Sequence, residues 1–97
     1  MGSPPMRHRV VWRTRVTNHI HTAAFLMYEH GRSEAPLFEA IAEINERLEL
    51  RPEEVGESRE DRERVLIQSP LTVWYEVFEQ DGVVLIYDAI LYPRQRM

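Results

Sequence analysis

The last third of the chain holds three runs of β-branched and aromatic residues, spread over residues 62–92. Turn-forming residues separate these runs at positions 68–70 and 79–82. Such runs bounded by turn formers are typical of consecutive strands. Pro70 has no N–H to donate to a sheet, and Asp81-Gly82 tolerates the positive φ of a tight hairpin. The pattern therefore predicts a three-stranded antiparallel meander.

Upstream of the meander the hydrophobic period changes to that of helices. Apolar residues recur at spacings of three and four between Thr14, a candidate N-cap, and His30, and Gly31 follows as a stop signal. A second helix opens at Ser33 and ends at Pro52, so close to the first that the two should form an antiparallel hairpin. The apolar stripes are Val16, Ile20, Ala23, Ala24 and Met27, then Leu37, Ala40, Ile41, Ile44 and Leu48. The other side of the second helix carries Glu39, Glu43, Glu46 and Arg47, which predicts a solvated face.

The order of these elements predicts an α+β domain. Residues 1–6 contain two prolines and no periodicity, which predicts a flexible leader ahead of a single domain over residues 7–97. Val10-Val11-Trp12 predicts a short N-terminal strand that joins the meander. A strand, a helical hairpin and three further strands give two layers, with the helices on one face of the sheet. No element remains to cover the second face, so we expect a binding groove or a subunit interface there.

Composition excludes several classes of protein. The chain has 97 residues, no cysteine, no signal-peptide pattern and no apolar run of the roughly 20 residues that cross a membrane. We therefore expect a cytoplasmic protein without a disulfide framework. The formal net charge of −4 opposes attraction of nucleic acid over the whole surface. The acidic residues cluster between Glu29 and Glu63, however, and both ends of the chain are basic, so the folded chain can still present a basic face.

All 12 basic residues are arginines, whose planar guanidinium suits phosphate, carboxylate and aromatic faces. Because the outer strands of a meander run in the same direction, we expect the arginines that flank it to lie toward one end of the sheet, at opposite corners. Trp74 and Tyr92 are their aromatic companions, and this combination is typical of single-stranded RNA binding. The alternative is that the arginines pair in solvent with Glu57, Glu60 and Glu63. The arginines in question are Arg59, Arg62 and Arg64 before the first strand, and Arg94 and Arg96 after the last.

Motifs of well-known catalytic sites are absent from the sequence. It contains no glycine-rich phosphate loop, no nucleophile elbow and no zinc-binding His-Glu-x-x-His helix. His19 and His21 are two residues apart, so on a helix they point away from each other and cannot share a metal. We expect neither a metal nor another cofactor. Asp88 interrupts the last strand, where we expect it either to pair with an arginine of a neighbouring strand or to orient a functional arginine.

Two stretches around the meander resemble a known family. Gly56-Glu57-Ser58-Arg59 precedes Arg64-Val65-Leu66-Ile67, and Pro70-Leu71-Thr72-Val73-Trp74-Tyr75-Glu76-Val77 follows. Together with the order of the elements, these stretches resemble the RelE/ParE superfamily, the toxin subunits of bacterial type II toxin–antitoxin systems. The resemblance extends from about Arg7 to Arg96, over nearly the whole predicted domain.

The resemblance implies one of two activities, and a protein partner. RelE-like members cleave mRNA in the ribosomal A site with basic residues and no metal, whereas ParE-like members bind and poison DNA gyrase. Both are held inactive by an antitoxin, whose extended or helical segment covers the toxin. A different class of function is a non-catalytic binding module or homodimer that has lost toxicity.

The site residues implied by the resemblance follow position by position. Thr72 occupies the place where ribonuclease members carry an arginine in the middle strand, and the tyrosine of a C-terminal helix has no match. For a ribonuclease, the catalytic residues would be Arg62, Arg64, Tyr92 and Arg94, and the RNA-binding residues would be Arg59, Arg96 and Trp74.

Overall fold

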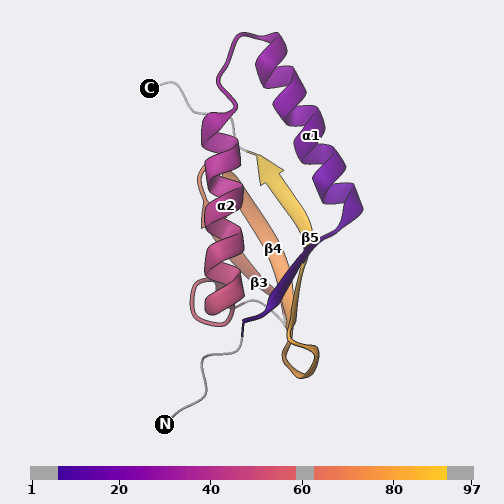
Figure 1. Ribbon diagram of the computed structural model, residues 1–97, viewed down its shortest axis with the longest axis vertical. Helices are drawn as coiled ribbons and strands as arrows, with labels where there is room; N and C mark the ends of the chain where they lie inside the picture. Colours follow the sequence, from indigo (N-terminus) through magenta and orange to yellow (C-terminus); the bar gives the residue numbers. More distant parts are fainter. Residues whose placement is uncertain (1–6, 59–62, 92–97) are drawn as a thin grey trace.

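The computed structural model describes residues 7–58 and 63–91, in which two helices pack on one face of a five-stranded sheet (Figure 1). The sheet order is β1-β5-β4-β3-β2; β1 runs parallel to β5, and the remaining neighbours are antiparallel. This arrangement confirms the predicted α+β fold, including the N-terminal strand, the helical hairpin and the meander. The elements are β1 (Arg9–Trp12), α1 (Thr14–Glu29), α2 (Ala35–Leu50), β2 (Glu57–Ser58), β3 (Glu63–Gln68), β4 (Leu71–Phe78) and β5 (Val83–Leu91).

Both helices begin and end close to the predicted positions. Helix α1 starts at Thr14 itself, so Arg13 occupies the N-cap position that was expected for Thr14. Gly31 follows α1 with φ +71°, a left-handed conformation that glycine adopts without steric cost. Ser33 Oγ accepts a hydrogen bond from the N–H of Ala35 at the start of α2. The buried residues of the two helices are Val16, Ile20 and Ala24, and Leu37, Ala40, Ile44 and Leu48, which confirms the predicted stripes.

The hydrophobic core lies between the helices and one face of the sheet. In β4 the odd-numbered residues from Leu71 to Val77 point toward the helices, and their partners on β3 and β5 share that face. Leu37, Ile44 and Leu48 of α2 are fully buried against them. Each such side chain stabilises the fold by about 1.5–3 kcal/mol relative to exposure to water. Trp12 of β1 also donates its indole N–H to Asn45 Oδ1 of α2 at 2.7 Å, which ties the first strand to the helix layer.

The turn between β4 and β5 follows the predicted Asp81-Gly82 signal. Residues Glu79–Asp81 form one turn of 3₁₀ helix, and Gly82 closes it with φ +63°. Farther along the pair, the register shifts between Trp74 and Tyr75, so that Tyr87 has no direct partner on β4. A bulge of this kind bends the strand and increases its local twist.

The expectation that the start of the first meander strand and the end of the third lie toward one end of the sheet is wrong. The register aligns the start of β3 with Glu76 and Leu85, whereas the end of β5, at Leu91, aligns with Leu71 and the end of β3. Strands that run in the same direction share their starts, so the start of one and the end of the other lie at opposite ends of the sheet. Four of the five flanking arginines, Arg59, Arg62, Arg94 and Arg96, lie outside the described residues.

The second face of the sheet is not covered by a helix within residues 7–58 and 63–91 (Figure 1). We call it the open face. It carries the even-numbered residues of β4, together with Val11 of β1, Val65 and Ile67 of β3, and Leu85 and Ile90 of β5. None of the helices in the described residues is long and apolar enough to cross a membrane.

Candidate functional site

Two of the seven predicted site residues, Arg64 and Trp74, lie in the part of the chain that the structure describes. They are on opposite faces of the sheet, because Arg64 is aligned with Tyr75 on the face toward the helices and Trp74 is on the open face. The structure therefore does not bring these two side chains into one site. The other five, Arg59, Arg62, Tyr92, Arg94 and Arg96, lie outside the described residues.

Arg64 is bound to the backbone of the connector between α2 and β2. Its Nη2 donates hydrogen bonds to the carbonyl oxygen of Glu53 at 2.6 Å and to that of Gly56 at 2.9 Å. The residue is half-buried, and its Nε is buried without a hydrogen-bond partner. Hydrogen bonds from a charged donor are stronger than neutral ones. The guanidinium of Arg64 therefore holds the connector in place.

Tyr75 fixes the same connector from the centre of the sheet. Its side chain is fully buried, and its hydroxyl donates to the carbonyl oxygen of Pro52 at 2.6 Å. Gly56 passes so close that a Cβ built there would lie 2.2 Å from Tyr75 Oη and 2.8 Å from the carbonyl oxygen of Val65. We call Arg64, Tyr75 and Gly56 the connector clamp. It determines how the chain enters β2.

The clamp should make the fold sensitive to alkaline pH. Burial raises the pKa of Tyr75 above its usual value of 10.0, with the hydrogen bond and charge of Arg64 acting in the opposite direction, and burial also raises the pKa of Tyr87. A raised pKa stabilises the folded state below the unfolded pKa, and this stability is lost as pH rises through the folded pKa. We expect the free energy of unfolding in urea to be level up to about pH 9.5 and to fall above about pH 10. Tyr75→Phe should have a lower free energy of unfolding than wild type at pH 8, but this free energy should fall less above pH 10. An equal fall in both proteins would contradict this role of Tyr75.

The open face is apolar at both ends and acidic between them. Trp74 is half-buried there and aligned with Val65 on β3 and Asp88 on β5. Glu63 and Glu76 are directly opposite each other on β3 and β4, an arrangement of like charges that destabilises a sheet. Thr72, where the resemblance implied an arginine in ribonuclease members, is also on this face and is 6% exposed. Among the described residues the open face thus carries the three carboxylates Glu63, Glu76 and Asp88 near its centre, with Arg9 of β1 at one end.

The carboxylates of this face also affect Tyr87. After burial, the largest contributions to its raised pKa come from the charge of Glu63 and from a hydrogen bond with that carboxylate, and Glu76 and Asp88 add to the effect. Asp88 Oδ1 accepts a hydrogen bond from the N–H of Ala89 at 2.9 Å. Among the described contacts of Asp88 there is no arginine, either of a neighbouring strand or at a functional site. The role that these contacts show for Asp88 is to bind the backbone N–H of the next residue.

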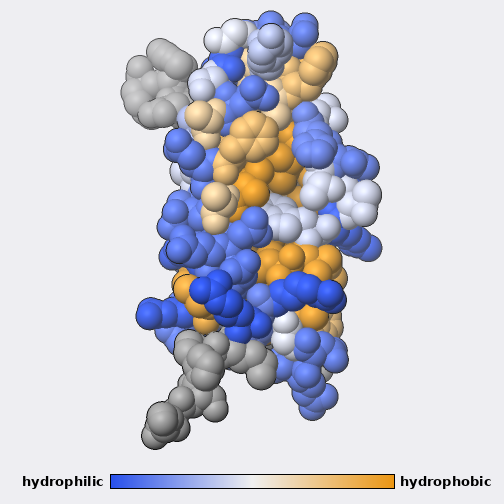
Figure 2. Space-filling model, viewed as in Figure 1, coloured by the Kyte–Doolittle hydropathy of each residue, from blue (hydrophilic) through white to orange (hydrophobic). Residues whose placement is uncertain are grey.

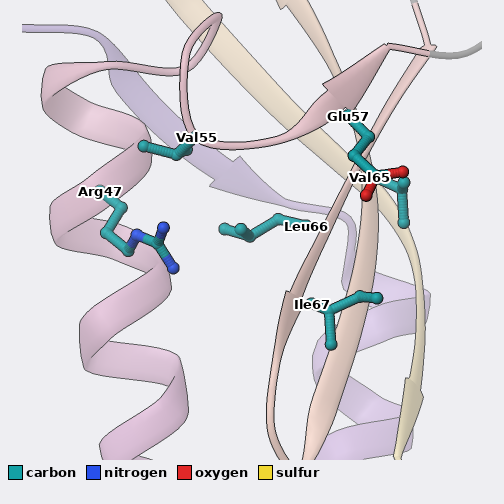
Figure 3. Close-up of a pocket in the computed structure, with 6 residues that line it drawn as sticks. All are labelled: Arg47, Val55, Glu57, Val65, Leu66 and Ile67. Atoms are coloured by element: carbon teal, nitrogen blue, oxygen red, sulfur yellow. The ribbon is translucent and has the colours of Figure 1, made fainter.

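Sequence reasoning missed a pocket between α2 and the edge of the sheet (Figure 3). It has a volume of about 170 Å³ and is open to solvent. Arg47 points into it from α2 and is fixed by a hydrogen bond of 2.8 Å from Nη1 to Gln68 Oε1. Arg47 was assigned to the solvated face of α2, but it is half-buried, because position 47 borders the apolar stripe at Ile44 and Leu48. The pocket is lined by Arg47, Val55, Glu57, Val65, Leu66 and Ile67.

A second missed feature is apolar surface near the tip of the helical hairpin (Figure 2). It comes from the last turns of α1 and the first turn of α2, on sides that do not face the sheet. Four large side chains there are between 47% and 69% exposed, more than most apolar residues of the helices: Phe25, Leu26, Tyr28 and Phe38. No group of three or more histidine or acidic side chains that could hold a metal occurs within residues 7–58 and 63–91.

The fold, with its β-α-α-β-β-β-β order of elements, is that of RelE toxins, the toxin subunits of type II toxin–antitoxin systems. The structure is similar to a chain of the toxin–antitoxin complex RelBE2 from Mycobacterium tuberculosis, with a TM-score of 0.67, 15% identity, and coverage of 93% of this chain and 97% of that one. It is also similar to a chain of the archaeal RelE–RelB complex from Pyrococcus horikoshii, with a TM-score of 0.63, 16% identity, and coverage of 93% and 100%. The resemblance inferred from the sequence is thus confirmed as a likeness of fold.

Comparisons of the sequence itself do not add to this result. No protein-family model matches the chain, and no curated protein matches it at a significant level. At 15% and 16% identity, the two structural matches show the fold, and the activity has to be argued from the residues of this chain.

Proposed function

We propose that this chain is the toxin-type component of a type II toxin–antitoxin pair, and that it acts by binding a protein target rather than by cleaving RNA. An antitoxin would keep it inactive, as the two similar structures, both toxin–antitoxin complexes, suggest. DNA gyrase is the protein target that the resemblance to ParE-like members supports. Both the target and the antitoxin would be met in the cytoplasm. The observation that carries the proposal is the presence of three carboxylates, Glu63, Glu76 and Asp88, on the open face.

The open face is poorly suited to a phosphate backbone. Glu63, Glu76 and Asp88 lie together on its central strands, and the described contacts include no ion pair from any of them to an arginine. A carboxylate repels a phosphate about 6 Å away by roughly 1–3 kcal/mol near a protein surface. RNA binding depends on the opposite sign of charge. A protein surface with arginine or lysine side chains would instead be attracted.

Two positions that the resemblance links to cleavage, Arg64 and Thr72, also do not offer a free cation. Both hydrogen bonds from Arg64 go to connector carbonyls, which leaves the guanidinium bound to the protein's own backbone. Thr72 offers no positive charge at the middle-strand position. Stabilising the charge that develops on a phosphate during cleavage requires cations aimed at it. The contacts of Arg64 and the presence of threonine at position 72 therefore favour a toxin-type protein that does not cleave RNA.

A second candidate is a metal-independent endoribonuclease, favoured by the concentration of arginines beside β3 and after β5. In that case Arg62 and Arg94 would stabilise the phosphate, Tyr92 would take part in proton transfer, and Arg59, Arg96 and Trp74 would hold the RNA. The start of β3, which Arg59 and Arg62 precede in the sequence, and the end of β5, which Arg94 and Arg96 follow, lie at opposite ends of the sheet. One RNA site would therefore use one of the two groups.

Induction of the protein in bacterial cells separates these functions. We expect growth arrest with intact mRNA, and equal arrest by the variant in which Arg59, Arg62, Arg94 and Arg96 are all glutamine. Primer extension across abundant transcripts and a gyrase supercoiling reaction with purified protein are the two readouts. Cuts at defined codons that disappear in the glutamine variant would establish the ribonuclease instead. Unimpaired growth would favour the module or homodimer without toxicity.

A further inference from the structure

We infer that two copies of this chain associate through the outer side of the helical hairpin. Three large aromatic side chains are exposed there: Phe25 and Tyr28 of α1, at 59% and 69%, and Phe38 of α2, at 47%. We call these three residues the hairpin patch. Single exposed apolar residues are ordinary, whereas several large ones grouped on a soluble domain mark an interaction surface. Figure 2 shows that the apolar surface continues between the two helices toward their tip.

Phe38 lies on the flank of α2 that is turned away from the β3 edge. Asn45 of α2 accepts the indole N–H of Trp12 on β1, whereas Arg47 lines the pocket beside β3. Phe38 precedes Asn45 by seven residues, or about two helical turns, and therefore shares its flank. Strand β1 is at the end of the sheet opposite to β3, next to β5, over which α1 packs. Phe38 is thus on the α1 side of α2.

Phe25 and Tyr28 lie on the matching flank of α1. Arg15 of this helix reaches the carbonyl oxygen of Tyr87, which lies on β5 beyond the end of its pairing with β1. Phe25 and Tyr28 are turned from Arg15 by about 80° and 140° around the helix, away from that edge. They do not face the sheet either, because Ile20 marks the buried stripe of α1. The hairpin patch therefore draws on both helices at the flanks that they turn toward each other.

The area of the hairpin patch matches what a second copy would bury. A large aromatic side chain offers about 150–250 Å², so the exposed fractions of the three residues amount to roughly 300–400 Å². Two copies would bury about twice this area from the patch alone, and the flanking helix surfaces would add more. Specific interfaces bury about 1,200–2,000 Å² in total, with weak ones below this range. The patch is thus large enough to form the centre of a reversible dimer.

The charges of the two helices make this surface complementary to itself. The exposed side of α2 is acidic, with Glu39, Glu43 and Glu46. Helix α1 carries one glutamate, Glu29, and one arginine, Arg15. Two α2 helices placed against each other would bring like charges together, whereas α1 placed across α2 of the second copy avoids this repulsion. A two-fold interface supplies one such pairing on each side of its axis.

This complementarity specifies how the two copies are arranged. The two-fold axis would run along the hairpin, with both tips at the same end. Helix α1 of one copy would then lie antiparallel to α2 of the other, and Phe25 and Tyr28 would pack against Phe38 of the second copy. The inference goes beyond the proposed function, because the dimer would leave the open face, on the other side of the sheet, uncovered.

Sedimentation velocity of the purified full chain, from micromolar to millimolar concentration, tests the association. We expect a reversible monomer–dimer equilibrium. Phe25→Glu and Phe38→Glu should each weaken the dimer by at least about tenfold, because each buries a carboxylate in an apolar interface. Ile90→Glu is the matched control, since it places the same charge at an exposed apolar residue of the open face, and it should leave the dimer unchanged.

Engineered cysteines test the arrangement in a chain that has none of its own. Tyr28→Cys and Phe38→Cys are prepared as separate proteins, mixed, and oxidised. Because a disulfide requires the two Cβ atoms to lie about 4 Å apart, the mixed disulfide should form faster than the disulfide of either variant with itself. Tyr28→Cys mixed with Ile90→Cys should form no such mixed product.

A chain that sediments as a monomer at millimolar concentration would overturn the inference. Equal weakening of a dimer by Phe38→Glu and Ile90→Glu would do so too, since it would place the contact elsewhere. Mixed disulfides that form no faster than the self-paired ones would reject the arrangement of α1 across α2. The cysteine variants do not depend on the folding of the glutamate variants. None of these results bears on growth arrest, so the proposed function stands or falls separately.

Discussion

Replacing Gly56 by alanine is expected to lower the free energy of unfolding by about 2–4 kcal/mol, since overpacking and a lost buried hydrogen bond act together. The new Cβ would lie 2.2 Å from Tyr75 Oη and 2.8 Å from the carbonyl oxygen of Val65. Neither atom can retreat easily, because Tyr75 is fully buried and Val65 is part of the sheet. Relief would require breaking the bond from Tyr75 to Pro52. Urea unfolding at pH 8 measures the effect.

Gly31→Ala provides the control. Gly31 has φ +71°, and nothing lies within 4 Å of a Cβ at that position, so the substitution costs about 1 kcal/mol of backbone strain alone. In a Gly56→Ala and Tyr75→Phe double variant, the hydroxyl that the new Cβ would strike is gone. The combined loss should be smaller than the sum of the two single losses. Strict additivity would show that the clash is not with the Tyr75 hydroxyl.

Replacing Arg64 by alanine is expected to cost about 2–3 kcal/mol of stability, the second large effect, because two charge-assisted hydrogen bonds to the connector are lost. The carbonyl oxygens of Glu53 and Gly56 would lose this donor. Lysine at this position should recover only part of the loss, since it has no planar fork to reach both carbonyls at once. Thermal and urea unfolding measure whether stability decreases in the order wild type, Arg64→Lys, Arg64→Ala.

Arg15→Ala is the comparison for Arg64, because Arg15 also donates to a backbone carbonyl but is exposed and 3.3 Å from it. Its loss should change stability by no more than about 0.5 kcal/mol. If Arg64→Ala left stability unchanged and abolished toxicity or RNA cleavage, Arg64 would be a functional residue as the family resemblance implied. A stable, active Arg64→Ala protein would exclude both roles.

Much of the fold was predictable because local patterns and packing agree. The helical stripes at spacings of three and four became the buried faces of α1 and α2, and the runs of β-branched residues became β3, β4 and β5. Strand β2 was missed, since Glu57–Ser58 has no apolar alternation and exists only as a partner of β3. The bulge at Trp74 and Tyr75 likewise depends on pairing across two strands, which a linear pattern does not contain.

The candidate site was harder to predict, because residue type does not reveal what a side chain contacts. Arg64 reads as a strand-end cation, yet it faces inward and binds the connector. Arg47 reads as part of a polar helix face, yet it lines the pocket beside β3. The alternation Arg64, Val65, Leu66, Ile67 held the signal for Arg64, since Leu66 shares its face and is buried. Depth of burial and the route of the connector had no signal in the sequence.

The parallel pairing of β1 with β5 determines when the sheet can be completed during synthesis of the chain. The strand nearest the start of the chain lies beside the last strand of the described sequence, and β5 separates it from β4. During synthesis, β1 and the helical hairpin leave the ribosome before the strand that completes their sheet. Until then β1 remains unpaired, and the apolar faces of the helices remain exposed and prone to aggregation. A toxic activity that required the complete sheet would thus be absent from every incomplete chain. An antitoxin that bound the helical hairpin as it emerged would bind before this activity was present.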